Sequence, residues 1–178
     1  MSFVIFESAI RTLYTCYNGG MRILGVDPGT ATTGFAVLEV KDGKRVVLDY
    51  GVVSTPSTQA MPDRLKTIYD DLRTIIAVHQ PDCIAIEQLF FTNNITTGIS
   101  VGQARGVVML VGAEHNLAFA EYTPLQVKQA VTGYGKATKQ QIQQMVKTIL
   151  GLSSIPKPDD AADALAIAIC HAATLKPV

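Results

Sequence analysis

Two apolar runs that each end in an acidic residue place the strongest constraint on how this chain folds. Asp27 follows Ile23-Leu24-Gly25-Val26, and Glu87 follows Ile84-Ala85-Ile86. Short apolar runs of this kind are typical of buried strands. A carboxylate beside a buried strand loses hydration, so it stays ionised only where positive charge compensates it. The sequence therefore predicts two core strands that end in an acidic site.

A second acidic pair heads the otherwise apolar stretch 161–169. Asp160 and Asp163 lie three residues apart, so on a helix they share one face. Lys157 is the one basic residue near these four acids in sequence, which leaves divalent cations as the expected counter-charge. Two such ions would activate water and stabilise the leaving oxygen in phosphodiester hydrolysis, and carboxylates suit Mg²⁺. A helix start that favours negative charge is the alternative; it explains Asp160 better than the deeper Asp163.

The order of the expected elements predicts an α/β fold. Three strands joined by short turns form an antiparallel meander, and a helix then leads to a strand that lies parallel to the first. The expected strands cover residues 22–27, 33–40, 45–54, 82–88 and 117–122, and the expected helices cover 62–80, 100–115 and most of the remainder. This layout predicts a ribonuclease H-like fold with a mixed five-stranded sheet (three antiparallel strands, then parallel strands) flanked by helices.

Composition indicates one compact domain. The chain has 178 residues, of which 48% are hydrophobic and 17% charged. No apolar run reaches the ~18 residues of a membrane helix, and three scattered cysteines suit a reducing compartment, so we expect a cytoplasmic protein without membrane contact. Residues 1–20 show no clear period and end in Asn18-Gly19-Gly20, a turn or linker signal. We expect them to be an extension or a mis-assigned start, and the domain to span 21–175.

The distribution of charge bears on the substrate. Net charge is zero, which at first argues against nucleic acid, yet residues 121–150 hold four lysines against one acid. A solvated helix face would carry the same lysines, so charge alone leaves the question open.

The loop 27–34 suggests an alternative function, phosphate binding in an ATPase. Its sequence Asp27-Pro28-Gly29-Thr30 is similar to the phosphate-cradling hairpin of actin- and sugar-kinase-like ATPases. Those enzymes close two such domains around a nucleotide, and this chain has room for one.

Five segments together resemble the RuvC family of Holliday-junction resolvases, the crossover junction endodeoxyribonucleases. They are Gly25-Val26-Asp27-Pro28-Gly29, Ala85-Ile86-Glu87-Gln88, Gly102-Gln103-Ala104-Arg105-Gly106, Gln126-Val127-Lys128-Gln129 and Asp160-Ala161-Ala162-Asp163-Ala164-Leu165-Ala166. The resemblance covers about residues 21–172. It implies a structure-selective endonuclease that resolves four-way DNA junctions in recombination and repair by paired, symmetric, metal-dependent nicks. It implies that Asp27, Glu87, Asp160 and Asp163 are the catalytic, metal-binding acids, although some members carry His at the Asp160 position.

The same resemblance assigns further roles. It implies two Mg²⁺ ions per subunit, with Mn²⁺ as a substitute, a homodimer, and a partnership with the RuvA–RuvB branch-migration complex. Lys128 and Lys139 match residues that contact DNA phosphates, and Phe90 matches a ring placed at the junction centre. Paired aromatics are more often core residues, but the polar segment that follows Phe91 favours an exposed loop in which a ring can stack on a base.

Three glycines recur every four residues at Gly98, Gly102 and Gly106. Each costs roughly 0.5–1 kcal/mol against Ala inside a helix, so close approach of another element is expected, either this chain's own sheet or a second subunit.

Two other functions remain open from sequence. One is a nuclease of the same fold that acts on RNA–DNA hybrids or on ends, which a comparison of junction and hybrid cleavage would separate. The other is a non-enzymatic junction-binding module, against which the presence of all four acids argues.

Overall fold

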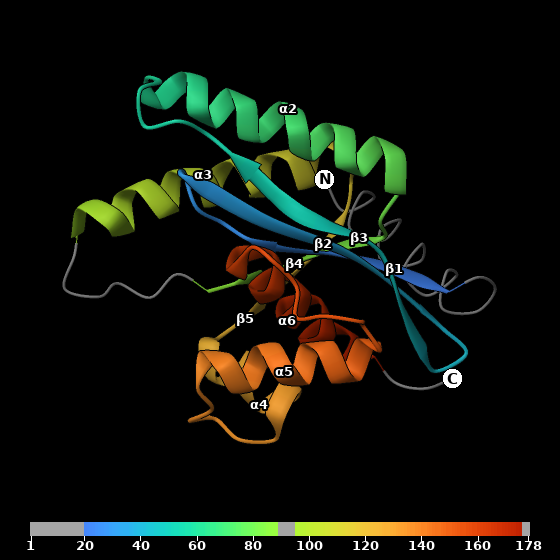
Figure 1. The fold of residues 1–178 in the computed structure, drawn as a ribbon. Coiled ribbons are helices and arrows are strands. Elements are labelled where there is room, and N and C mark those ends of the chain that lie inside the picture. Colours follow the sequence, from blue (N-terminus) through green and yellow to red (C-terminus); the bar gives the residue numbers. More distant parts are fainter. Residues whose placement is uncertain (1–19, 89–94, 176–178) are drawn as a thin grey trace.

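The computed structural model describes residues 20–88 and 95–175 as a sheet with helices on both faces (Figure 1). The strands are β1 (Met21–Asp27), β2 (Thr32–Lys41), β3 (Lys44–Ser54), β4 (Cys83–Glu87) and β5 (Ala118–Tyr122). The helices are α2 (Met61–His79), α3 (Ile95–Glu114), α4 (Pro124–Thr132), α5 (Lys139–Leu150) and α6 (Asp159–Thr174). None of the helices in the described ranges is long and apolar enough to cross a membrane.

The sheet has the order β3-β2-β1-β4-β5, which confirms the predicted mixed five-stranded topology. β1, β2 and β3 pair antiparallel as a meander, whereas β4 pairs parallel with β1 and β5 parallel with β4. Val26 is level with Ile86 in the parallel pair, so Asp27 and Glu87 leave adjacent strands at the same end. The register therefore brings these two acids together, as the sequence predicts.

Each face of the sheet has its own hydrophobic core. Alternate residues of β1 and β4 point to opposite faces, as strand geometry requires. Leu24, Val26, Ile84 and Ile86 pack with α2 and α3, whereas Ile23, Cys83 and Ala85 pack with α4, α5 and α6. The second core is centred on α6, whose residues 164–170 are all buried. Figure 1 shows α2 and α3 together on one side of the sheet and α4, α5 and α6 on the other.

Two glycines let α6 lie directly against the backbone of β1 and β2. A Cβ on Gly25 would overlap the carbonyl oxygen of Ala164 and stand 2.9 Å from the Ala168 methyl. A Cβ on Gly34 would stand 2.6 Å from the carbonyl carbon of Asp160. Because Gly34 pairs with Asp27 across the first two strands, this close approach brings the start of α6 to the acidic end of the sheet.

The described structure differs from the sequence prediction in two places. α3 begins at Ile95 rather than near residue 100, although its first turn holds β-branched residues and a glycine, which have weak helix propensity. The predicted helical remainder is three helices, separated by left-handed glycines at Gly133 and Gly151. Thr123 and Thr138 begin α4 and α5 with capping boxes, a signal that the sequence carries.

The close approach of α6 predicts a specific cost for a methyl group at Gly25. Gly25→Ala should lower the free energy of unfolding by roughly 1–3 kcal/mol, because its neighbours are helix backbone atoms that cannot move separately. Gly51→Ala is the matched control, since a Cβ there would meet the Phe35 ring at 3.1 Å and a ring can rotate away. Urea unfolding of both variants measures the difference. Equal costs at the two positions would contradict this account.

Candidate active site

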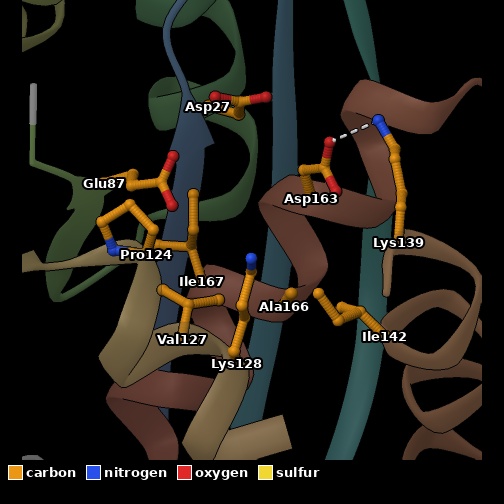
Figure 2. A pocket seen from close by; sticks show the side chains of 10 residues that line it. All are labelled: Asp27, Glu87, Pro124, Val127, Lys128, Lys139, Ile142, Asp163, Ala166 and Ile167. Carbon is orange, nitrogen blue, oxygen red and sulfur yellow. Dashed lines mark hydrogen bonds and ion pairs between the residues drawn. The ribbon is translucent and has the colours of Figure 1, made fainter. Parts of the chain in front are cut away.

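Three acids converge on one open cleft at the end of the sheet. Asp27 ends β1, Glu87 ends β4, and Asp163 lies in the second turn of α6. All three line a cleft of about 260 Å³, together with Lys128 from α4 and Lys139 from α5. Figure 2 shows these carboxylates and both lysine side chains around the same opening. The remaining wall is apolar and comes from the start of α4 and from α5 and α6: Pro124, Val127, Ile142, Ala166 and Ile167.

The carboxyl group of Asp27 has a strongly raised pKa. Burial, followed by repulsion from Asp163, Glu87 and Asp160, raises its pKa from 3.8 to about 7. Burial and the charge of Asp163 also raise the pKa of Glu87, against an opposing effect from Lys128. The site therefore holds more negative charge than its own lysines compensate.

Lys139 is the main counter-charge that the protein itself supplies. Its ammonium lies 3.0 Å from a carboxylate oxygen of Asp163 and 3.6 Å from one of Asp159. Burial raises the pKa of the Asp163 carboxyl, and the hydrogen bond from Lys139 partly offsets that rise. For Lys139 itself, burial acts to lower the pKa, but the hydrogen bond and charge of Asp163 outweigh it, so the pKa rises. Lys139 thus sits inside the acidic cleft rather than on a remote DNA-binding face.

Arg105 of α3 holds the end of β4 in place. It donates a 2.7 Å hydrogen bond to the backbone carbonyl of Glu87 and forms a 2.6 Å ion pair with Glu121 on β5. Its side chain is only 14% exposed. A further backbone hydrogen bond joins the Gln88 amide to the Tyr122 carbonyl at 2.8 Å. This support of the Glu87 backbone was not predicted, because the sequence motif around Arg105 does not reveal what the side chain contacts.

The remaining predicted site residues have different positions. Asp160 is half-exposed in the first turn of α6, outside the cleft lining, but close enough for its charge to raise the pKa of Asp27. Lys128 lines the cleft beside the acids. Phe90 lies outside the described residues. A Cβ on Gly106 would meet nothing within 4 Å, so this glycine does not face the chain's own sheet.

The donor set fits divalent cations. Carboxylate oxygens are the ligands that Mg²⁺ prefers, and burial together with three neighbouring acids makes the negative charge of Asp27 unfavourable without a cation. Across residues 20–88 and 95–175, however, no three Asp, Glu, His or Cys side chains stand close enough to hold a metal as they are arranged. Asp163 is turned toward Lys139 (Figure 2). Asp27, Glu87 and Asp163 line the same cleft and are the residues that would hold a cation once their carboxylates come closer together.

Comparison with known proteins places the chain among DNA nucleases. The family described as crossover junction endodeoxyribonuclease RuvC matches residues 23–171. Relatives with that name from Alkaliphilus oremlandii and Caldicellulosiruptor saccharolyticus are 58% and 55% identical, covering 86% and 85% of this chain and 94% and 92% of their own. Thermus thermophilus RuvC, solved in complex with a Holliday junction substrate, is 36% identical with a TM-score of 0.81 over 85% of this chain and 93% of its own.

A more distant solved structure shares the fold alone. The yeast mitochondrial Holliday junction resolvase Ydc2 has a TM-score of 0.59 at 16% identity, covering 84% of this chain and 78% of its own. The class that these findings define is an endodeoxyribonuclease of the ribonuclease H-like fold. The chain belongs to the RuvC family of crossover junction endodeoxyribonucleases.

The raised pKa of Asp27 predicts how the stability of the metal-free protein depends on pH. Its folded pKa of about 7 lies above the ordinary value of 3.8, so its contribution to stability is complete below about pH 4 and is lost as pH rises through 7. Asp27→Asn cannot ionise. At pH 8 it should be more stable than the wild type by on the order of 1–4 kcal/mol, and this gain should vanish near pH 4.

Urea unfolding in EDTA at both pH values measures the effect. Asp71→Asn is the matched control, because Asp71 is exposed on α2 and far from the cleft in the fold. Its difference from the wild type measures the effect of an Asp-to-Asn change away from the cleft. If the difference in unfolding free energy between Asp27→Asn and the wild type does not depend on pH, burial does not raise the pKa of this carboxyl.

Proposed function

We propose that this protein resolves Holliday junctions by metal-dependent hydrolytic nicks in two opposed strands, in recombination and DNA repair. The observation that carries the proposal is the convergence of Asp27, Glu87 and Asp163 from β1, β4 and α6 on one under-compensated cleft. Membership of the RuvC family supports the same substrate. We infer that Asp27, Glu87, Asp160 and Asp163 are the catalytic acids.

The proposal includes two Mg²⁺ ions per subunit, with Mn²⁺ as a substitute. Bound ions of this kind would activate the attacking water and stabilise the leaving oxygen. Asp27, Glu87 and Asp163 would hold them, with Asp160 at the edge of the site. The apolar wall of Val127 and Ile167 keeps bulk water from one side of the cleft.

The two lysines of the cleft are proposed to contact DNA phosphates in this mechanism. Lys128 and Lys139 line the cleft on the side of α4 and α5, where they would pair with the phosphates next to the cleaved bond. Lys139 then exchanges its ion pair with Asp163 for a contact with DNA, and the Asp163 carboxylate becomes available to a cation. Phe90 is proposed to stack at the junction centre, as the family resemblance implies.

The exposed face of α3 supports a homodimer. Ile99, Met109 and Leu110 on this helix are 55%, 44% and 54% exposed, and Gly106 is open to close approach. A helix that is apolar on its solvent side as well as its core side is typical of an element covered by a partner. A two-fold dimer would place one cleft on each of two opposed strands, which matches the symmetry of a four-way junction.

The wider setting of the protein belongs to the same proposal. We place the nuclease domain at residues 21–175 and regard residues 1–20 as an extension that the activity does not need. The RuvA–RuvB branch-migration complex is the proposed protein partner, and the cytoplasm, where bacterial DNA lies, is the proposed location.

Cleavage of a mobile four-way junction tests the function directly. The wild type should nick the junction with Mg²⁺ and not in EDTA. Asp27→Asn, Glu87→Gln and Asp163→Asn should abolish nicking yet bind the junction as tightly or more tightly, because loss of negative charge weakens repulsion of the phosphates. The exposed Asp71→Asn should cleave like the wild type. Loss of binding together with cleavage would show that the acids have a structural role.

A charge on α3 tests the dimer. Leu110→Glu should give a monomer by light scattering, because a carboxylate cannot be buried in an apolar interface without a partner. Its junction products should change from paired to single nicks. Val78→Glu is the control, since Val78 is 68% exposed near the end of α2 and outside the proposed interface. A Leu110→Glu dimer would exclude this face.

A further inference from the structure

The segment beside the cleft carries lysines and no acidic residue. Residues 123–150, which form α4, α5 and the loop between them, contain four lysines and no acid. Lys128 and Lys139 line the cleft, and Lys136 is exposed on the loop. α2, by comparison, carries acids and bases together. This uneven charge favours a polyanion as the partner of the segment.

The same loop presents a large aromatic ring to solvent from a backbone that is held firmly. Tyr134 is 59% exposed. Its amide donates to the Thr132 hydroxyl at 3.1 Å, and its carbonyl accepts from that hydroxyl at 2.9 Å and from the Ala137 amide at 3.2 Å. Ala137, three residues later, is buried and anchors the loop. The exposure of the ring is therefore a property of an ordered loop.

The loop is packed against the first turn of α4. A Cβ on Gly135 would overlap Cδ1 of Leu125, so the Leu125 side chain lies against the loop at this glycine. Leu125 is in the first turn of α4, next to Pro124, which lines the cleft. The loop that carries Tyr134 thus contacts a residue that directly follows a cleft residue in the chain.

We infer that Tyr134 and Lys136 form a second DNA contact outside the cleft, in which the ring stacks on an unpaired base of the junction and Lys136 pairs with a phosphate. Every base offers a face to an aromatic ring, and stacking combined with lysine contacts is typical of single-strand binding. A protein partner is less suited to this surface, because it lacks the acids that would pair with a mixed-charge interface. The inference rests on the proposed junction-cleaving function.

Binding of the full-length protein to a four-way junction tests the inference. Fluorescence anisotropy in EDTA, over a range of salt concentrations, compares the wild type with three variants. Tyr134→Ala should weaken binding by about 5- to 150-fold with an unchanged salt slope. Tyr134→Phe, which keeps the ring, should bind within about twofold of the wild type. Lys136→Ala should reduce the salt slope by about one unit.

Val78→Ala is the matched control, an exposed apolar side chain on the opposite layer, and should bind like the wild type. Thermal unfolding of each variant should match the wild type, because Tyr134 and Lys136 are exposed. Wild-type affinity in Tyr134→Ala would overturn the inference while leaving the cleavage function standing. A loss in Tyr134→Phe equal to that in Tyr134→Ala would overturn stacking. A wild-type protein that neither binds nor nicks the junction would overturn both proposals.

Discussion

The close contact between α6 and the backbone of β1 and β2 is the constraint on which the site depends. Sheet pairing alone brings together Asp27 and Glu87, which end adjacent parallel strands. The third acid of the cleft comes from a helix, and a helix lies within reach of a strand end only if the two backbones can approach. Gly25 and Gly34 permit that approach, because each faces a carbonyl group of α6. Asp163 then completes the cleft.

This arrangement concentrates negative charges in a partly buried cleft, and the lysines of the protein compensate them only in part. Lys139 pairs with Asp163, and Lys128 offsets part of the rise in the pKa of Glu87. For Asp27, burial and the three neighbouring acids outweigh the opposing charge of Lys139, so its carboxyl favours the protonated form up to about pH 7. An acidic site that its own lysines do not neutralise is suited to binding cations, whereas a fully neutralised one would have to break its ion pairs first.

Much of this architecture can be predicted from the sequence, since the strands end in acids and the short turns fix their order. The register that joins Asp27 to Glu87 follows from those features. Long-range side-chain contacts cannot be predicted in this way, because they depend on how helices and strands pack together. Two examples are the hydrogen bond from Arg105 to the Glu87 carbonyl and the position of Lys139 in the cleft. The early start of α3 was missed because local propensity opposed it.

The glycines that allow α6 to pack closely on the sheet have a consequence for surveys of mutational tolerance. In a scan that selects for activity, Gly25 and Gly34 would tolerate few side chains, since any Cβ meets helix backbone. Their profiles would look the same as those of residues that act on the substrate. Neither glycine has a side chain that could take part in catalysis. Positions that tolerate no substitution therefore include residues needed for helix–sheet packing as well as residues of the active site. Ranking positions by intolerance alone would therefore overstate the size of the active site.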